Sequence, residues 1–94
     1  MGKKVLNYFK DLGLTPDDVK LILESAPEIL DMTDDEIIKN IELVIDYGYP
    51  RNDIGTLVQV NPSFIISSYE LLDDLLRAIG DDLEEKLKDN PFLI

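Results

Sequence analysis

Apolar residues recur along this chain of 94 residues at the spacing of three and four that amphipathic helices show. Between 19 and 26 they occupy positions 19, 22, 23 and 26, and between 37 and 45 positions 37, 38, 41, 44 and 45. The stretch 71–79 repeats this spacing, as does 54–61, where Asn61 occupies the last position of the stripe. No stretch alternates with the period of two that a half-buried strand requires. The pattern therefore predicts an all-α fold.

Helix-capping residues and helix breakers place the ends of these helices. Thr15 precedes Pro16, which suits a first helical position, while Thr33 and Ser67 each begin a capping-box sequence that ends in glutamate. Glycines that can adopt a left-handed conformation close the preceding helices, and prolines end the shorter ones. Six helices are expected, with a single turn after each of three prolines, at residues 3–12, 16–25, 34–47, 51–60, 69–79 and 81–89.

Glycines and prolines also mark an internal repeat. The markers alternate along the chain as Gly13, Pro27, Gly48, Pro62, Gly80 and Pro91. A shift of 35 residues superimposes the first two copies, and a third copy fits when three residues are omitted after Gly80. We expect one domain, 1–94, made of a half-repeat (1–12), repeat one (13–47), repeat two (48–80) and a truncated repeat (81–94). Stacked helix pairs would bury a continuous core as a short α-solenoid, and a compact bundle is the alternative.

Two segments of this repeat resemble a known family. The strings L-G-L-T at 12–15 and A-P-E-I-L at 26–30, followed by a capping box and a long helix, are similar to the repeat of mitochondrial transcription termination factors (mTERF). The segment I-G-T-L-V-Q-V-N-P-S-F-I-I at 54–66 is similar as well. The resemblance covers about residues 5–94. It implies a left-handed superhelix of helices and, as in the family, nucleic-acid binding along a basic concave groove.

The charge of the chain points to a different partner. Twenty acidic residues stand against nine basic ones, for a net charge of −11, whereas affinity for nucleic acid rests on cations that meet phosphates. Four basic residues are candidates for that role, either as phosphate contacts or as parts of a solvated helix surface: Lys4, Lys39, Arg51 and Arg77. Only the first two coincide under the repeat shift. We therefore expect a binding module that recognises a protein through its acidic surface. The alternatives are mTERF-like nucleic-acid binding in transcription regulation, and an orphan or designed scaffold without a ligand.

Residue types needed for much of enzyme chemistry are absent from the sequence. It contains no cysteine and no histidine, and it lacks a glycine-rich phosphate loop and a calcium-loop pattern. Three acidic pairs, 17–18, 34–35 and 81–82, are expected in first helical turns, where the helix dipole stabilises negative charge. We expect no catalytic residues, no metal and no cofactor, hence no enzyme.

Hydrophobic segments of the kind that direct a chain to a membrane or an organelle are also absent. Without a signal peptide, a transit peptide or an apolar run of membrane-spanning length, a cytoplasmic protein with no membrane partner is expected. We expect a monomer, with a weak dimer as the alternative. The apolar segment Pro91–Ile94 is expected to fold onto the last two helices.

Overall fold

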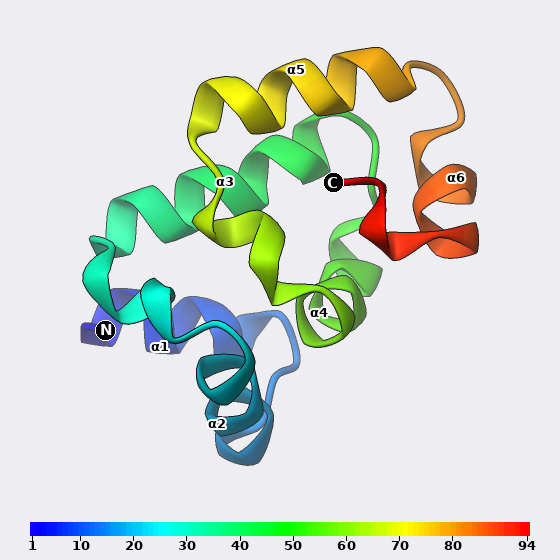
Figure 1. The fold of residues 1–94 in the computed structure, drawn as a ribbon. Helices are drawn as coiled ribbons and strands as arrows, with labels where there is room; N and C mark the ends of the chain where they lie inside the picture. Colours follow the sequence, from blue (N-terminus) through cyan, green and yellow to red (C-terminus); the bar gives the residue numbers. More distant parts are fainter.

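The fold is built entirely from helices (Figure 1). The computed structural model describes all 94 residues and contains no strand. Its elements are α1 (Lys3–Asp11), α2 (Pro16–Ser25), η1 (Pro27–Asp31), α3 (Asp34–Asp46), α4 (Arg51–Val60), η2 (Pro62–Ile66), α5 (Tyr69–Ile79), α6 (Leu83–Asp89) and η3 (Pro91–Leu93), where η denotes a short 3₁₀ helix. The all-α class and the single turn after each repeat proline are confirmed. Helices α1 and α3 each end one residue earlier than the sequence predicted.

Helix starts follow the capping signals at two of three places. Thr15 and Thr33 each form a complete capping box, with Asp18 and Glu36 respectively. The box predicted at Ser67 is wrong, because the N-cap of α5 is Ser68, whose hydroxyl accepts a hydrogen bond from the backbone N–H of Leu71 (3.2 Å). This shift of one residue removes Glu70 from the third helical position, so it cannot reach back to the cap.

The third acidic pair does not lie in a first helical turn. Helix α6 begins at Leu83, two residues later than predicted, and Asp82 precedes it in a left-handed conformation (φ 63°) without a capping hydrogen bond. The third copy of the repeat is shorter after Gly80, so Asp81 and Asp82 are used to turn the chain before the helix can start. Asp82 thus lies at the N-cap, next to the positive end of the helix dipole, while Asp81 lies outside the helix.

The helices stack in series in two rows. One row consists of α1, α3 and α5, which we call the long helices after α3 and α5, the two longest of the chain; α1 packs on α3 and α3 on α5. In the other row α2 packs on α4, and the 3₁₀ helices η1 and η2 contact one another (Figure 1). Side chains between the rows form one core, in which Phe9, Ile37, Ile54, Phe64 and Leu76 are fully buried. Each helix thus hides its apolar stripe against its neighbours in the series, as expected for helical repeats.

Two buried asparagines join successive parts of the stack. The amide of Asn40 on α3 donates hydrogen bonds to the carbonyl oxygens of Ile65 (2.8 Å) and Ser67 (2.9 Å), at the end of η2. The amide of Asn61 donates to the carbonyl oxygen of Pro91 (2.9 Å), at the start of η3. Both side chains occupy positions of apolar stripes, and both provide partners for backbone groups that no regular helix satisfies.

The C-terminal segment is only partly packed, contrary to the sequence-based expectation. Its backbone is held by Asn61 and by Asn90, whose side chain accepts from the N–H of Phe92 (3.1 Å), and Ile94 packs against the core. Phe92, however, is 66% exposed and Leu93 is 40% exposed. Within one chain Phe92 lies mostly in solvent and Leu93 is partly exposed.

Candidate binding surfaces

The four candidate nucleic-acid contacts all interact with other side chains of the protein. Lys4 forms an ion pair with Asp35 (2.5 Å), which joins α1 to α3. The ammonium group of Lys39 lies 4.0 Å from the ring centroid of Tyr69, in a cation–π contact that joins α3 to α5. The two arginines, Arg51 and Arg77, each bind a carboxylate that also binds a tyrosine.

The first of these arginine clusters lies where α1, α3 and α4 meet. Arg51 binds Glu42 through two parallel hydrogen bonds (2.9 and 2.8 Å), and the Tyr8 hydroxyl donates to the same carboxylate. Bonding to the guanidinium holds the pKa of Glu42 below its usual range. Burial, reinforced by the hydrogen bond to Glu42, raises the pKa of Tyr8. The cluster therefore keeps Tyr8 neutral and Glu42 charged.

The second cluster repeats this chemistry between α3 and α5. The Tyr47 hydroxyl donates to Asp73 (2.5 Å), Arg77 forms an ion pair with the same carboxylate, and Asp74 lies 3.6 Å from the guanidinium. The hydrogen bond to Asp73 raises the pKa of Tyr47. A tyrosine, a carboxylate and an arginine thus meet at both contacts between long helices.

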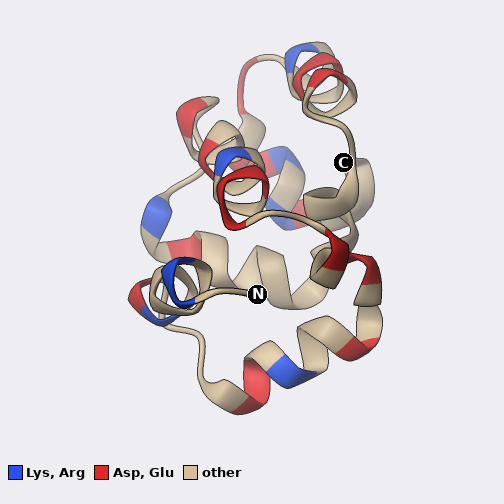
Figure 2. Cartoon of the chain, turned by 90° about the vertical axis from the view of Figure 1, so that its left-hand side faces the viewer, with Lys and Arg blue, Asp and Glu red and all other residues tan.

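These contacts change the interpretation of the basic residues. The sequence alone suggested a solvated helix surface as the alternative to phosphate binding, but each of the four side chains has a partner within the protein. They also lie on different elements among many acidic residues (Figure 2). Lys3, Lys10 and Lys20 form no ion pair and no cation–π contact. A fourth unpaired cation, Lys86 on α6, donates to the carbonyl oxygen of Ile79 (2.8 Å). Free positive charge therefore lies mainly on α1 and α2.

The segment from α2 to η1 carries negative charge that no ion pair neutralises. Of the 20 acidic residues in the chain, only six take part in ion pairs, and none of the six lies between residues 16 and 31. We call this segment the α2–η1 surface. Its acids are Asp17, Asp18, Glu24, Glu28 and Asp31. Leu21 and Leu30 are more than half exposed on it, so the surface combines negative charge with apolar side chains.

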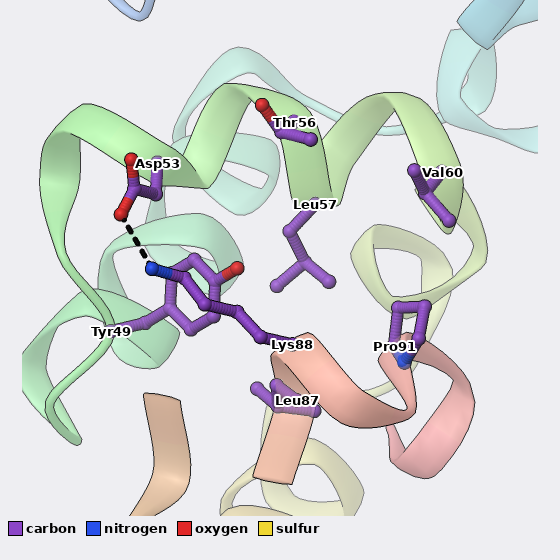
Figure 3. Close-up of a pocket in the computed structure, with 8 residues that line it drawn as sticks. All are labelled: Tyr49, Asp53, Thr56, Leu57, Val60, Leu87, Lys88 and Pro91. Carbon is purple, nitrogen blue, oxygen red and sulfur yellow. Dashed lines mark hydrogen bonds and ion pairs between the residues drawn. The ribbon is translucent and has the colours of Figure 1, made fainter. Parts of the chain in front are cut away.

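A groove of about 240 Å³ separates α4 from α6 (Figure 3). Leu57 and Val60 of α4 face Leu87 of α6 and Pro91 across it. Lys88 crosses one end of the groove and pairs with Asp53 on α4 (2.8 Å) and with Glu84 on its own helix (2.7 Å). The volume is below the roughly 300–1,000 Å³ of typical small-molecule sites, so the groove suits an apolar side chain of a partner.

Equivalent positions of α4 and α6 differ beside this groove. Gly55 on α4 lies so close to the preceding turn that an added Cβ would be 2.6 Å from the carbonyl oxygen of Leu12. Counted back from Pro62 and Pro91, the same position in the next copy is Glu84, which lines a pocket together with Tyr47. A glutamate cannot approach backbone as closely as glycine can, so this position does not allow α6 the close contact with a turn that Gly55 allows α4.

The structure contains no group of three or more carboxylates placed to share a metal ion. None of its helices has both the length and the apolar composition needed to cross a membrane.

The sequence indicated some of these features and missed others. It identified Lys4, Lys39, Arg51 and Arg77 but not their partners, since the contacts join residues up to 31 positions apart. It did not single out Asn40 or Gly55. A polar residue inside the apolar stripe 37–45 was the available signal for the first, and a glycine inside a helical stripe was the signal for the second.

Comparison with known proteins gave one match. The model of the family described as mTERF matches residues 2–89 of the chain. No curated protein and no solved structure matches.

Proposed function

We propose, from the premise that this chain belongs to the mTERF family, that it is a non-enzymatic binding module whose partner is a protein with a basic surface. Members of this family generally act by binding rather than by catalysis. The question for this chain is therefore which class of macromolecule it binds.

A single observation carries the choice of a protein over a nucleic acid. All four candidate phosphate contacts are engaged within the molecule, three of them by carboxylates. To bind a phosphate, Lys4, Arg51 or Arg77 would have to leave a carboxylate, and the phosphate would enter the field of a chain with net charge −11. Counterion release, which drives nucleic-acid binding, needs cations that are free to meet phosphates.

The α2–η1 surface is the part of the molecule best suited to a basic partner. Its five acids lack ion pairs, and Leu21 and Leu30 supply exposed apolar area beside them. Opposite charge on a partner would speed encounter and fix orientation, while apolar contacts would supply most of the affinity.

A direct titration tests the proposal that the protein does not bind nucleic acid. We expect duplex DNA and single-stranded RNA to bind no more tightly than non-specific ligands, with dissociation constants weaker than about 10⁻⁶ M at about 0.15 M salt. Tighter binding that is lost in an Arg51→Gln, Arg77→Gln double variant would establish the family's nucleic-acid function instead.

Capture of partners from nuclease-treated extract tests the surface. A variant with Glu24→Gln, Glu28→Gln and Asp31→Asn removes three charges that make no hydrogen bond within the protein. The matched control, Asp46→Asn, Glu85→Gln and Asp89→Asn, removes three equally unpaired charges elsewhere. We expect the first variant to lose basic proteins that the wild type and the control retain. Equal capture by all three would contradict the proposed surface.

A further inference from the structure

The two ends of the helix stack expose helix faces of opposite charge. On α1, Lys3, Leu6 and Lys10 follow one another at spacings of three and four and therefore share a face. Leu6 is 44% exposed, and neither lysine forms an ion pair. This α1 face consists of one leucine between two free cations.

The last long helix presents the counterpart. On α5, Glu70 and Asp74 lie one turn apart with Leu71, which is 52% exposed, beside them. Glu70 has no ion pair, and Asp74 has only the long contact to Arg77. Arg77, one turn after Asp74, borders this face and is paired with Asp73 and Asp74. The α5 face therefore consists of one leucine beside two acids, with a paired arginine at its edge.

Within the molecule, long helices already bind one another in series through such faces. Helix α1 packs on α3, and α3 packs on α5. The first contact is held by the pairs Lys4–Asp35 and Tyr8–Glu42, and the second by Tyr47–Asp73 and the contact of Lys39 with Tyr69. A long helix of this chain is thus suited to receive another long helix on each side.

A groove at the start of the stack lies where a preceding long helix would fit. It has a volume of about 650 Å³ and is lined by residues of α1 and α2 that include Leu6, Asn7 and Pro16. Thirty-five residues later the same positions are Ile41, Glu42 and Arg51, and there Tyr8 of the preceding long helix binds Glu42. The equivalent site inside the molecule is therefore occupied by a helix.

We propose that copies of this chain associate head to tail, with the α1 face of one copy on the α5 face of the next. A second copy is the occupant that charge favours, because one chain carries both the free lysines and the exposed acids. Since the two faces differ, the contact is heterologous, and each copy keeps one face free for a further copy. The acids that test the function proposed above, Glu24, Glu28 and Asp31, do not line this groove, so the association can fail without the proposed function failing.

Sedimentation velocity on the intact chain measures this association. We expect the weight-average mass to rise at least about twofold above 10.7 kDa between dilute and millimolar protein at about 0.15 M salt. There the Debye length of about 8 Å screens the repulsion between chains of net charge −11 more than the close contacts between the faces. The mass should fall back toward 10.7 kDa at about 1 M salt, where the Debye length is about 3 Å. A mass that stays at 10.7 kDa at every concentration at about 0.15 M salt would overturn the proposal.

Variants in which the charges of one face are reversed identify the contact between the copies. Variant one carries Lys3→Glu and Lys10→Glu, and variant two carries Glu70→Lys and Asp74→Lys. Each alone presents like charges at both ends and is expected to remain monomeric, whereas an equimolar mixture restores opposite charges and is expected to associate. A control with Lys20→Glu and Asp17→Lys, which lie outside both faces, is expected to associate like the wild type. Circular dichroism melting establishes that each variant is folded.

The mixture separates this arrangement from a symmetric dimer. A closed dimer would use the same surface on both copies. In that case one of the variants would associate by itself, or the mixture of the two would fail to associate. Either result would contradict the contact between α1 and α5.

Discussion

Asparagines placed inside apolar stripes hold successive parts of the stack together. Asn40 and Asn61 are the buried polar side chains of the core, and each donates to backbone carbonyls at a 3₁₀ helix of the next repeat copy, Asn40 at η2 and Asn61 at η3. Short 3₁₀ helices leave carbonyl oxygens without partners, and an unpaired buried carbonyl is costly. The amide groups therefore contribute to how the helices are positioned as well as to stability.

Replacing Asn40 with leucine should destabilise the protein although it fills the site with apolar volume. The carbonyls of Ile65 and Ser67 would lose their donor, and a buried unsatisfied group costs about 1–3 kcal/mol. Urea unfolding measures this loss, and Asn7→Leu, at an exposed position without a hydrogen bond, is the control. An Asn40→Leu protein as stable as the wild type would show that water replaces the amide.

The tyrosine–glutamate–arginine cluster gives stability a dependence on alkaline pH. The pKa of Tyr8 is raised in the folded protein, chiefly by burial, so folding favours the neutral phenol. This stabilisation is complete below the unfolded pKa of about 10 and is lost as the pH rises through the folded pKa. Tyr8→Phe should lower stability at neutral pH but flatten its decline above about pH 10.

Urea unfolding at a series of pH values between neutral and strongly alkaline measures this slope. Tyr69→Phe, which removes a phenol that makes no hydrogen bond, is the control and should decline like the wild type. Identical slopes for Tyr8→Phe and the wild type would mean that Tyr8 ionises as easily in the folded as in the unfolded chain.

At the scale of the helices, most starts and stops were predictable because they depend on neighbouring residues. Thr15 and Thr33 cap their helices within four residues of the groups they bind. The error at Ser67 has a long-range cause: Asn40, 27 residues away, binds the Ser67 carbonyl and so favours Ser68 as the cap. Local signals predicted the helix, but they did not predict which of two adjacent serines would be its N-cap.

The partners of Lys4, Lys39 and Arg51 could not be predicted for the same reason, because they lie on other helices. The pairing of Arg77 with Asp73, four residues earlier on α5, follows from helix geometry alone. A lysine at position 4 and an aspartate at position 35 meet only because α1 packs on α3, and periodicity gives no register for that packing. The burial of the C-terminal segment was also misjudged. Its apolar composition indicated a packed position, but nothing in the chain covers Phe92.

The close approach of Gly55 to the turn at Leu12 leads to a test at this scale. Alanine favours helix over glycine by about 1 kcal/mol, so propensity alone predicts that Gly55→Ala stabilises the protein. We expect net destabilisation, because the new Cβ would lie 2.6 Å from a backbone oxygen that cannot move without shifting α4 from the turn. Thermal melting measures the effect, with Thr56→Ala at an exposed position of the same helix as the control. A higher melting temperature for Gly55→Ala would contradict this contact.

A glycine at the end of α3 has a different requirement. Gly48 adopts φ of 119°, and an added Cβ would meet no atom within 4 Å. Gly48→Ala should therefore cost about 1–2 kcal/mol through backbone strain alone, and Gly48→Val at least as much. A change of less than about 0.5 kcal/mol in urea unfolding would mean that the turn relaxes to another conformation.

On the scale of the whole molecule, net charge opposes compactness. Fourteen of the acidic residues make no ion pair, while the pairs that do form are largely exposed and each contribute little. Added salt should therefore weaken the repulsion among the unpaired acids more than it weakens the attraction within the ion pairs. We expect the urea midpoint to rise between about 0.02 and 0.5 M sodium chloride. A midpoint that falls would show that the interhelical ion pairs contribute more than the repulsion.

The difference between Gly55 and Glu84 also bears on how the molecule opens. Helix α3 is packed on both sides, by α1 and by α5, whereas α6 rests on α5 and η3 and is separated from α4 by the groove. Regions with few buried contacts unfold locally at a lower free energy than the core does. Amide protons of α6 should thus exchange with solvent through a partial opening that leaves the rest of the stack intact. Those of α3 should exchange only when the whole domain unfolds, so α6 and the rest of the stack would exchange as two separate units.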